Sequence, residues 1–308
     1  MKTKMIAVFF CVALLVTSCG EKKDTIRIAT KPMTEQFILA EMLSALIREN
    51  TPYEVKITKG MGGGSSNIHP ALLKGDFDLY PEYTGTGWIV ILKRDSFPAA
   101  DKLYAELTKA YHDRFGLKWV APYGFNNAYS LAVSRENAEK YRLDKFSDLA
   151  KHPDTFVLGA EYDFFEIPMG YKDLCECYNL KFRKTLDMDI GLKYEAIKSG
   201  KIDVVNIFTT DGQLNESGLK VLEDDKHFFP TYYCATLVRE DVLEEHPGLE
   251  EALQKMGGIL TDSEMAGLNY QVDINGRSER EVAHEFLQKK GLLQNSKPVK
   301  ENTAWMNR

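Results

Sequence analysis

The sequence has few of the features that mark enzymes or nucleic-acid-binding proteins. It contains 308 residues with a net charge of −6, and its lysines and arginines form no basic run, so a nucleic acid is not an expected partner. No Gly-x-Ser-x-Gly motif is present, and no Lys-Ser/Thr pair follows the glycine-dense segment 60–66. The signatures of a hydrolase and of a phosphate-binding loop are therefore missing. We expect neither catalysis nor a cofactor.

Cysteine and histidine are also scarce, with five and six residues. Cys175 and Cys177 lie close together, but no second pair of ligands follows at a spacing typical of zinc, so we expect no metal site. We interpret Cys175, Cys177 and Cys234 as structural. A disulfide between two of them remains open if the chain lies outside the cytoplasm.

One apolar run stands out, Met5–Val16 near the N-terminus. It follows a positively charged start, is too short to span a bilayer comfortably, and ends in small residues before Cys19. This pattern is typical of a secretory signal peptide. We predict that residues 1–18 are removed and that residues 19–24 form a short tether. An ordinary signal peptide in which Cys19 has no special role is the alternative.

The remaining chain alternates between strand-like and helix-like segments, which is typical of βαβ units. We therefore predict an α/β fold with two lobes, each built on a mainly parallel central sheet. The chain is expected to enter the second lobe once and to leave it once, so that two segments form a hinge. The predicted lobes are 25–122 with 225–308, and 123–224.

An internal repeat relates the two predicted lobes. The segment 78–86 returns in altered form as 203–211, and each copy follows a helix-like segment and a glycine. Tyr83 aligns with Phe208, each at the carboxyl end of a predicted buried strand. Ligands of such folds bind beyond the carboxyl ends of the strands. Both rings are therefore expected at the gap between the lobes.

Two more tyrosines, Tyr129 and Tyr232, flank the predicted crossings between the lobes. Each ring taken alone is more simply explained by core packing. Four rings around one gap would instead hold a trimethylammonium group, which has no N–H to donate, at roughly 1–2 kcal/mol per ring. The gross sum of ~4–8 kcal/mol approaches the ~8 kcal/mol of a micromolar complex. Gln36 and Thr86 are neutral groups suited to the other end of such a ligand.

Several segments resemble, in order, the substrate-binding lipoproteins of osmoprotectant ABC transporters, the OpuAC/ProX-like family that binds glycine betaine, carnitine or choline. The resemblance runs from Ile26 to Leu293 and rests on 31–36, 80–86, 124–129, 188–192, 210–212 and 222–230. It implies a type II periplasmic-binding-protein fold. It also implies a lipidated Cys19, an aromatic box of Tyr83, Tyr129, Phe208 and Tyr232, and polar ligand contacts from Gln36 and Thr86.

The sequence departs from the family pattern at three positions. Phe208 stands where Tyr is usual, and Ile167 stands where Arg is common, which favours choline or another weakly acidic quaternary amine. Trp88 is unusual and is a candidate for a further ring near the box. Ergothioneine, a trimethylammonium betaine bound by relatives of the family, is an alternative ligand.

The resemblance implies a monomeric, extracytoplasmic protein, anchored to the membrane by lipid, that passes a small quaternary amine to the permease subunits of an ABC transporter. Two other functions stay open at this point. One is a sensory receptor domain of the same fold, and the other is an enzyme that acts on a small amine in the same cleft.

Overall fold

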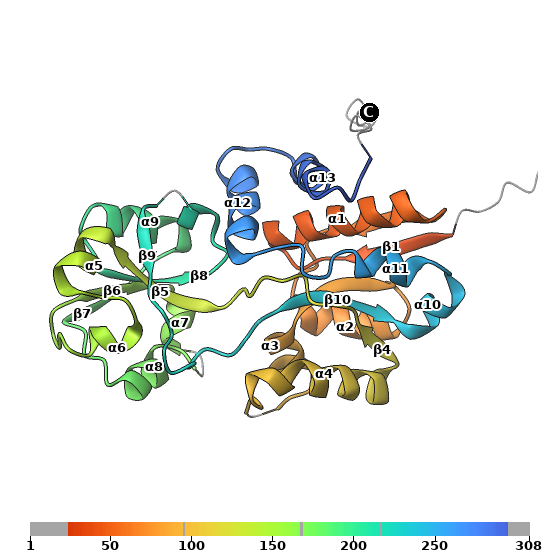
Figure 1. The fold of residues 1–308 in the computed structure, drawn as a ribbon. Coiled ribbons are helices and arrows are strands. Elements are labelled where there is room, and N and C mark those ends of the chain that lie inside the picture. Colours follow the sequence, from red (N-terminus) through yellow and green to blue (C-terminus); the bar gives the residue numbers. More distant parts are fainter. Residues whose placement is uncertain (1–23, 95, 167–168, 216, 295–308) are drawn as a thin grey trace, which may run out of the picture.

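The computed structural model describes residues 24–94, 96–166, 169–215 and 217–294, in which the strands form two five-stranded sheets (Figure 1). The first sheet has the order β2-β1-β3-β10-β4 and consists of β1 (Thr25–Ala29), β2 (Glu54–Thr58), β3 (Leu79–Tyr83), β4 (Leu117–Trp119) and β10 (Cys234–Arg239). The second has the order β7-β6-β8-β5-β9 and consists of β5 (Tyr129–Ser134), β6 (Val157–Ala160), β7 (Lys184–Asp187), β8 (Val204–Phe208) and β9 (Leu219–Val221). The predicted signal peptide and Cys19 lie outside the described residues.

Helices surround both sheets. Those in the half with the first sheet are α1 (Thr34–Asn50), α2 (Ser65–Leu73), α3 (Thr84–Thr86), the π-helix η1 (Gly87–Ile91), α4 (Ala100–Phe115), α10 (Glu240–Glu245), α11 (Leu249–Gln254), α12 (Asp262–Asp273) and α13 (Glu279–Lys289). Those in the half with the second sheet are α5 (Arg135–Tyr141), α6 (Phe146–Leu149), α7 (Tyr162–Glu166), α8 (Tyr171–Tyr178), α9 (Ile190–Lys198) and the short 3-10 helix η2 (Gly212–Asn215). In Figure 1, α12 lies between the two halves.

The two sheets share one pairing pattern. In the first, β1 pairs in parallel with β2 and β3, whereas β10 pairs antiparallel with β3 and β4. In the second, β6 pairs in parallel with β7 and β8, whereas β5 pairs antiparallel with β8 and β9. The βαβ prediction accounts for the parallel pairs. In each sheet the first strand after a crossing, β5 or β10, adds the antiparallel ones, so both sheets are mixed.

Successive residues of β3 point to opposite faces of the first sheet, as strand geometry requires. Leu79 belongs to an apolar cluster with α1, and Tyr80 belongs to a cluster with α4 on the other face. Trp88 lies in the second cluster, is 6% exposed, and its Nε1 donates to the Ser96 carbonyl at 2.7 Å. Trp88 is therefore a core residue, and the suggestion that it adds a ring to the box is wrong.

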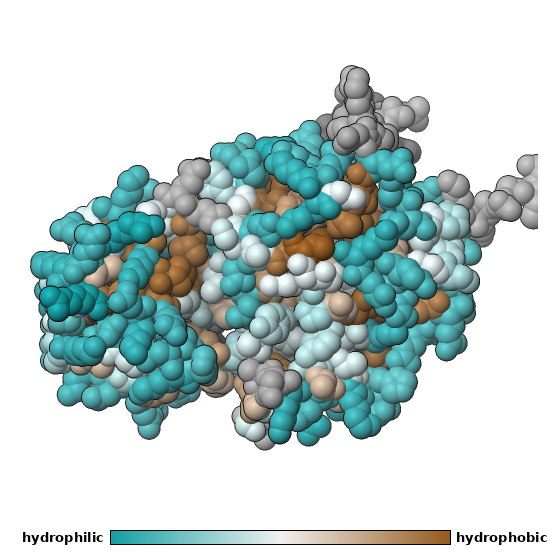
Figure 2. All heavy atoms as spheres, viewed as in Figure 1, coloured by the Kyte–Doolittle hydropathy of each residue, from teal (hydrophilic) through white to brown (hydrophobic). Residues whose placement is uncertain are grey.

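The two connections between the sheets lie side by side. The Asn127 amide donates to the Tyr232 carbonyl at 3.2 Å, and the Tyr232 amide donates to Oδ1 of Asn126 at 2.5 Å. Asn126 and Tyr233 also form an antiparallel bridge. Beside these connections the surface is indented between the two halves (Figure 2). The lobe boundaries at 122/123 and 224/225 stay a prediction.

Helix α12 provides a further contact between the two halves, which the sequence did not indicate. Nδ2 of Asn269 donates to the Thr210 carbonyl at 2.9 Å. Gly212 of η2 approaches α12 so closely that an added Cβ would lie 2.8 Å from the Tyr270 backbone nitrogen. The segment after β8 therefore packs directly against α12.

Candidate functional site

A cavity of about 190 Å³ lies where the ends of strands from both sheets meet. Its lining residues are Lys31, Met33, Tyr83, Thr86, Asn127, Tyr129, Phe208 and Tyr232. The structure thus brings together five of the six residues predicted to bind ligand, including all four aromatic ones. The sixth, Gln36, is not among the lining residues.

The strand pairing explains why the four rings converge. Phe208 ends β8 and is paired with Tyr129, the first residue of β5, so that their ring centroids lie 4.4 Å apart at an interplanar angle of 32°. Tyr83 ends β3 and is paired with Cys234, the first residue of β10, and Tyr232 comes two residues before it. Each sheet therefore contributes the end of its middle strand and the start of the neighbouring strand.

A glycine positions the Tyr232 ring. Gly85 lies in α3, and a Cβ added there would lie 2.4 Å from the Tyr232 ring, well inside normal contact distance. Thr84, one residue earlier, donates from its hydroxyl to the Thr231 carbonyl at 2.9 Å and accepts from the Tyr233 amide at 3.1 Å. These contacts fix the segment that carries Tyr232 against the start of α3, next to Thr86.

Lys31 is a cavity residue that the sequence analysis missed. Its ammonium lies 4.5 Å from the centroid of the Tyr83 ring and forms an ion pair with Glu82. Glu82 is fully buried, and Lys31 is 7% exposed. The Lys31 ammonium is therefore a cation already held against the Tyr83 ring. The rings of Tyr129, Phe208 and Tyr232 have no such contact with Lys31. The only sequence signal was a lysine two residues after β1, inside the family-like segment 31–36.

A second buried lysine stands behind Phe208. The Lys193 ammonium lies 5.8 Å from the Phe208 ring centroid, 2.5 Å from Oε1 of Glu161 and 3.2 Å from Oδ2 of Asp211. Asp211 Oδ2 also accepts from the Phe208 amide at 3.1 Å and from the Tyr194 hydroxyl at 2.8 Å. Since two carboxylates face one lysine, this group carries a net negative charge behind the cavity wall.

Glu35 supports the opposite wall from within the protein. Its Oε1 accepts from the Tyr83 hydroxyl at 2.5 Å and from Nδ2 of Asn127 at 3.0 Å, and its Oε2 accepts from Nδ2 of Asn269 at 3.4 Å. Burial raises the pKa of Glu35 despite these donors. Asn127, a cavity residue that we did not predict, is thus held by the same carboxylate as Tyr83.

The cavity tyrosines stay neutral at ordinary pH. Burial, followed by the nearby Glu35, raises the pKa of Tyr83 well above its usual value. Burial, followed by the charge of Glu161, raises the pKa of Tyr129 to about 12. Burial also raises the pKa of Tyr232. The walls are therefore uncharged phenol and phenyl rings, whose faces attract cations.

Gln36 lies behind the cavity wall. It is fully buried, its Oε1 accepts from the Lys31 amide at 3.5 Å, and its Nε2 has no partner in the described part of the chain. Its predicted contact with a ligand is not seen in the cavity lining and stays a prediction.

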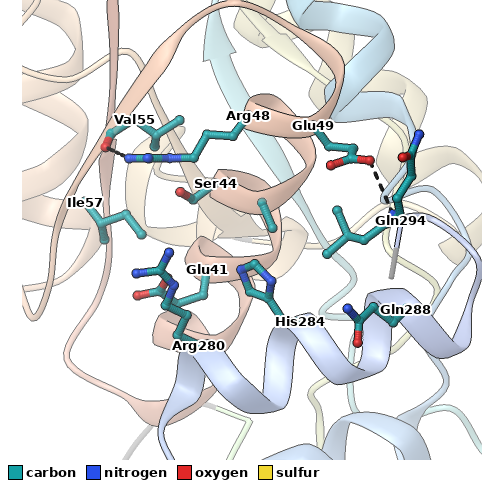
Figure 3. Close-up of a pocket in the computed structure, with 12 residues that line it drawn as sticks. Glu41, Ser44, Arg48, Glu49, Val55, Ile57, Arg280, His284, Gln288 and Gln294 are labelled. Carbon is teal, nitrogen blue, oxygen red and sulfur yellow. Dashed lines mark hydrogen bonds between the residues drawn. The ribbon is translucent and has the colours of Figure 1, made fainter. Parts of the chain in front are cut away.

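A different cavity, of about 360 Å³, lies between α1, β2 and α13 (Figure 3). Arg48, Glu49, Arg280 and His284 point into it, and Arg48 donates to the Val55 carbonyl at 2.7 Å. Its described lining residues include no Phe, Tyr or Trp. It therefore lacks the rings needed to hold a trimethylammonium group.

Other kinds of site are not evident in the described ranges. No group of three or more His, Cys, Asp or Glu side chains there is arranged to hold a metal ion. Cys175, Cys177 and Cys234 are free thiols. Within the same ranges, no helix has the length and apolarity required to cross a bilayer.

Comparisons with known proteins point to one family. Residues 24–289 match the family model OpuAC, the substrate binding domain of ABC-type glycine betaine transport systems. A solved structure described as a glycine betaine/carnitine/choline ABC transporter is 32% identical with a TM-score of 0.83, covering 87% of this chain and 100% of its own. Apo YehZ from Escherichia coli is 26% identical with a TM-score of 0.75, covering 87% of this chain and 99% of its own.

Two curated relatives differ in the ligand that they are named for. The ergothioneine transport permease/ergothioneine binding protein EgtU of Helicobacter pylori is 45% identical over 279 residues, 91% of this chain, and this chain spans 50% of its length. The carnitine transport binding protein OpuCC of Listeria monocytogenes is 35% identical over 306 residues, covering 96% of this chain and 99% of its own. Sequence, fold and relatives together show that the chain belongs to the OpuAC family of transport substrate-binding proteins, which are not enzymes.

Proposed function

We propose that this protein captures a small trimethylammonium compound between Tyr83, Tyr129, Phe208 and Tyr232 and delivers it to the permease of an ABC transporter. One observation carries the proposal, namely that three rings from two separate sheets and a fourth from the segment before β10 line a single cavity of about 190 Å³. A permethylated ammonium donates no hydrogen bond, so it gains more from ring faces and from exclusion of water than from polar partners. The net negative group around Lys193 adds a favourable field.

The other end of the ligand is assigned to polar groups of the first lobe. Lys31, Thr86 and Asn127 line the same cavity. The Lys31 ammonium is paired with Glu82 but has three N–H groups, so it can also donate to a ligand carboxylate. Ile167, where the family commonly has Arg, lies outside the described residues. Lys31 therefore offers a carboxylate contact that does not depend on that position, and a zwitterion fits as well as choline.

Two ligands of this class are favoured by specific observations. The 45% identity with a relative named for ergothioneine favours that compound. The 35% identity with a carnitine-binding relative of nearly equal length favours carnitine. Both carry a trimethylammonium group and a carboxylate, so both match the rings and Lys31.

Calorimetry with choline, glycine betaine, carnitine, proline betaine and ergothioneine tests the proposal. Each ligand is paired with its unmethylated counterpart, such as ethanolamine for choline and glycine for glycine betaine. Tyr129→Ala should raise Kd about 5- to 30-fold, because one ring contributes roughly 1–2 kcal/mol. The matched control is Tyr162→Ala, since Tyr162 is 61% exposed and outside the cavity. Equal binding of methylated and unmethylated partners would contradict the proposed cage.

We also propose that lipid on Cys19 anchors the mature, monomeric protein to the outer side of a membrane. The support is the signal-like segment 1–18, whose residues the structure does not describe. In cells, Cys19→Ser should move the protein from the membrane fraction to the soluble extracytoplasmic fraction. An unchanged distribution would show that Cys19 does not carry the anchor.

A further inference from the structure

A larger cavity, which we call the outer cavity, adjoins the proposed cage. Its volume is about 1040 Å³, more than five times that of the cage. Tyr129 and Tyr232 line both cavities, so the two spaces share a wall formed by two of the cage rings. A ligand whose ammonium group sits against these rings therefore lies next to the outer cavity.

The outer cavity is mainly apolar. Its lining comes from four places, namely the stretch from η1 into the first turn of α4, the first residue of β5, the segment that returns from the second sheet, and one residue before α8. The residues are Ile89, Arg94, Ser96, Phe97, Pro98, Ala99, Leu103, Tyr129, Met169, His227, Phe228, Phe229, Pro230, Thr231 and Tyr232. No carboxylate occurs among these described lining residues, so the cavity supplies no counter-ion to a second cation.

Three of its apolar side chains, Ile89, Phe228 and Phe229, keep part of their surface exposed. Ile89 is 37% exposed on η1, whereas its neighbour Trp88 is packed in the core. Phe228 and Phe229 are only partly buried, at the edge of the second apolar cluster. Apolar surface left beside a binding cavity is typical of a site that buries part of a ligand.

We propose that the outer cavity is a second subsite, which receives an apolar or aromatic substituent carried by the quaternary ammonium ligand. This inference rests on the proposed function, because the cage positions the substituent. The ligand class then consists of trimethylammonium compounds with an alkyl chain or a planar ring, in addition to compact osmolytes. Each methylene buried in this subsite should strengthen binding about three- to fourfold.

A chain-length series tests the inference on the intact protein. Calorimetry would compare the tetramethyl-, butyltrimethyl-, hexyltrimethyl- and octyltrimethylammonium ions. We expect Kd to fall by about three- to fourfold per added methylene until the subsite is filled. The variant Ile89→Asn should reduce this gain per methylene. Its matched control, Ile274→Asn, changes an isoleucine that is 48% exposed and lines neither cavity, and it should keep the wild-type gain.

Failure of the subsite and failure of the cage give different results. If tetramethylammonium binds but longer chains bind no better, the outer cavity is not a subsite. If Ile89→Asn and Ile274→Asn give the same gain per methylene, the substituent does not lie in this cavity, and the inference is equally overturned. If hexylamine binds as well as hexyltrimethylammonium while the chain-length gain persists, the outer cavity holds the chain but the cage proposal is wrong.

Discussion

Gly85 determines how closely the Tyr232 ring can approach α3. A Cβ at this position would lie 2.4 Å from the ring, so Gly85→Ala must displace Tyr232 from the cavity wall. We expect ligand affinity to fall about 5- to 30-fold, the contribution of one ring. Calorimetry with the best ligand measures the change. Gly62→Ala is the control, because an added Cβ there meets no atom within 4 Å, and it should bind as the wild type does.

Glu35 should make stability depend on pH. Burial raises its pKa in the folded protein, so between the ordinary glutamate pKa and the raised value the folded state binds more protons than the unfolded state. The stabilising contribution of Glu35 is then full below the ordinary pKa and is lost as pH rises through the raised one.

Denaturant unfolding between about pH 4.5 and about pH 7 tests this pH dependence of stability. The range starts near the ordinary pKa of a glutamate side chain. Glu35→Gln keeps an acceptor for the Tyr83 hydroxyl but cannot ionise. We expect it to remove part of the decrease in unfolding free energy with rising pH. Glu244→Gln, at an exposed position of α10, should leave the decrease unchanged. Identical pH profiles for wild type and Glu35→Gln would contradict the expectation.

Among the individual residues of the site, the aromatic ones were predictable from the sequence, and the charged ones were not. Tyr83 and Phe208 follow from the repeat, because equivalent strands end at the same edge of their sheets. Lys31, Asn127 and Lys193 were missed, because their roles depend on partners distant in sequence, such as Glu82, 51 residues from Lys31. A single sequence shows that a lysine is present but not that it is buried.

At the scale of elements, α9 is tied to the end of β8 through Lys193. This side chain is fully buried and pairs with Glu161 and Asp211. Lys193→Met would leave two carboxylates around the vacated cation position, which we expect to cost about 3–5 kcal/mol of unfolding free energy. Chemical denaturation checks this. Lys198→Met on the same helix changes an exposed lysine and should alter stability little, whereas equal effects of both variants would refute the role of Lys193.

Most elements were visible in the sequence, and their exceptions have physical reasons. Apolar spacing predicts helices over 135–141 and 279–289, and α5 and α13 have these bounds, Arg135–Tyr141 and Glu279–Lys289. The sequence predicts a strand over 77–80, whereas β3 starts two residues later and extends to Tyr83. Strand β10 was missed because it is buried on both faces and therefore lacks the alternation that marks a half-exposed strand. Its antiparallel pairing makes the first sheet mixed.

At the scale of the whole molecule, the cage draws its rings from both halves of the chain. Tyr129 and Phe208 belong to the second sheet, whereas Tyr83 belongs to the first. A ligand that contacts all of them favours the arrangement in which the halves are closest. We expect the radius of gyration measured by X-ray scattering to decrease on ligand addition. Tyr129→Ala should need more ligand for the same decrease. No change at saturating ligand would show that binding occurs without closure.

The pairing of the two connections restricts how such a closure can proceed. Because Asn126 and Tyr233 bridge the two connecting segments, we expect the joint to bend as one hydrogen-bonded ribbon and not as two independent segments. A ribbon bends about an axis in its plane more easily than it shears along its length. Each closure would then bring the same cavity side chains to face one another. The hydrogen bonds of the joint would therefore help to keep the binding site the same from one closure to the next.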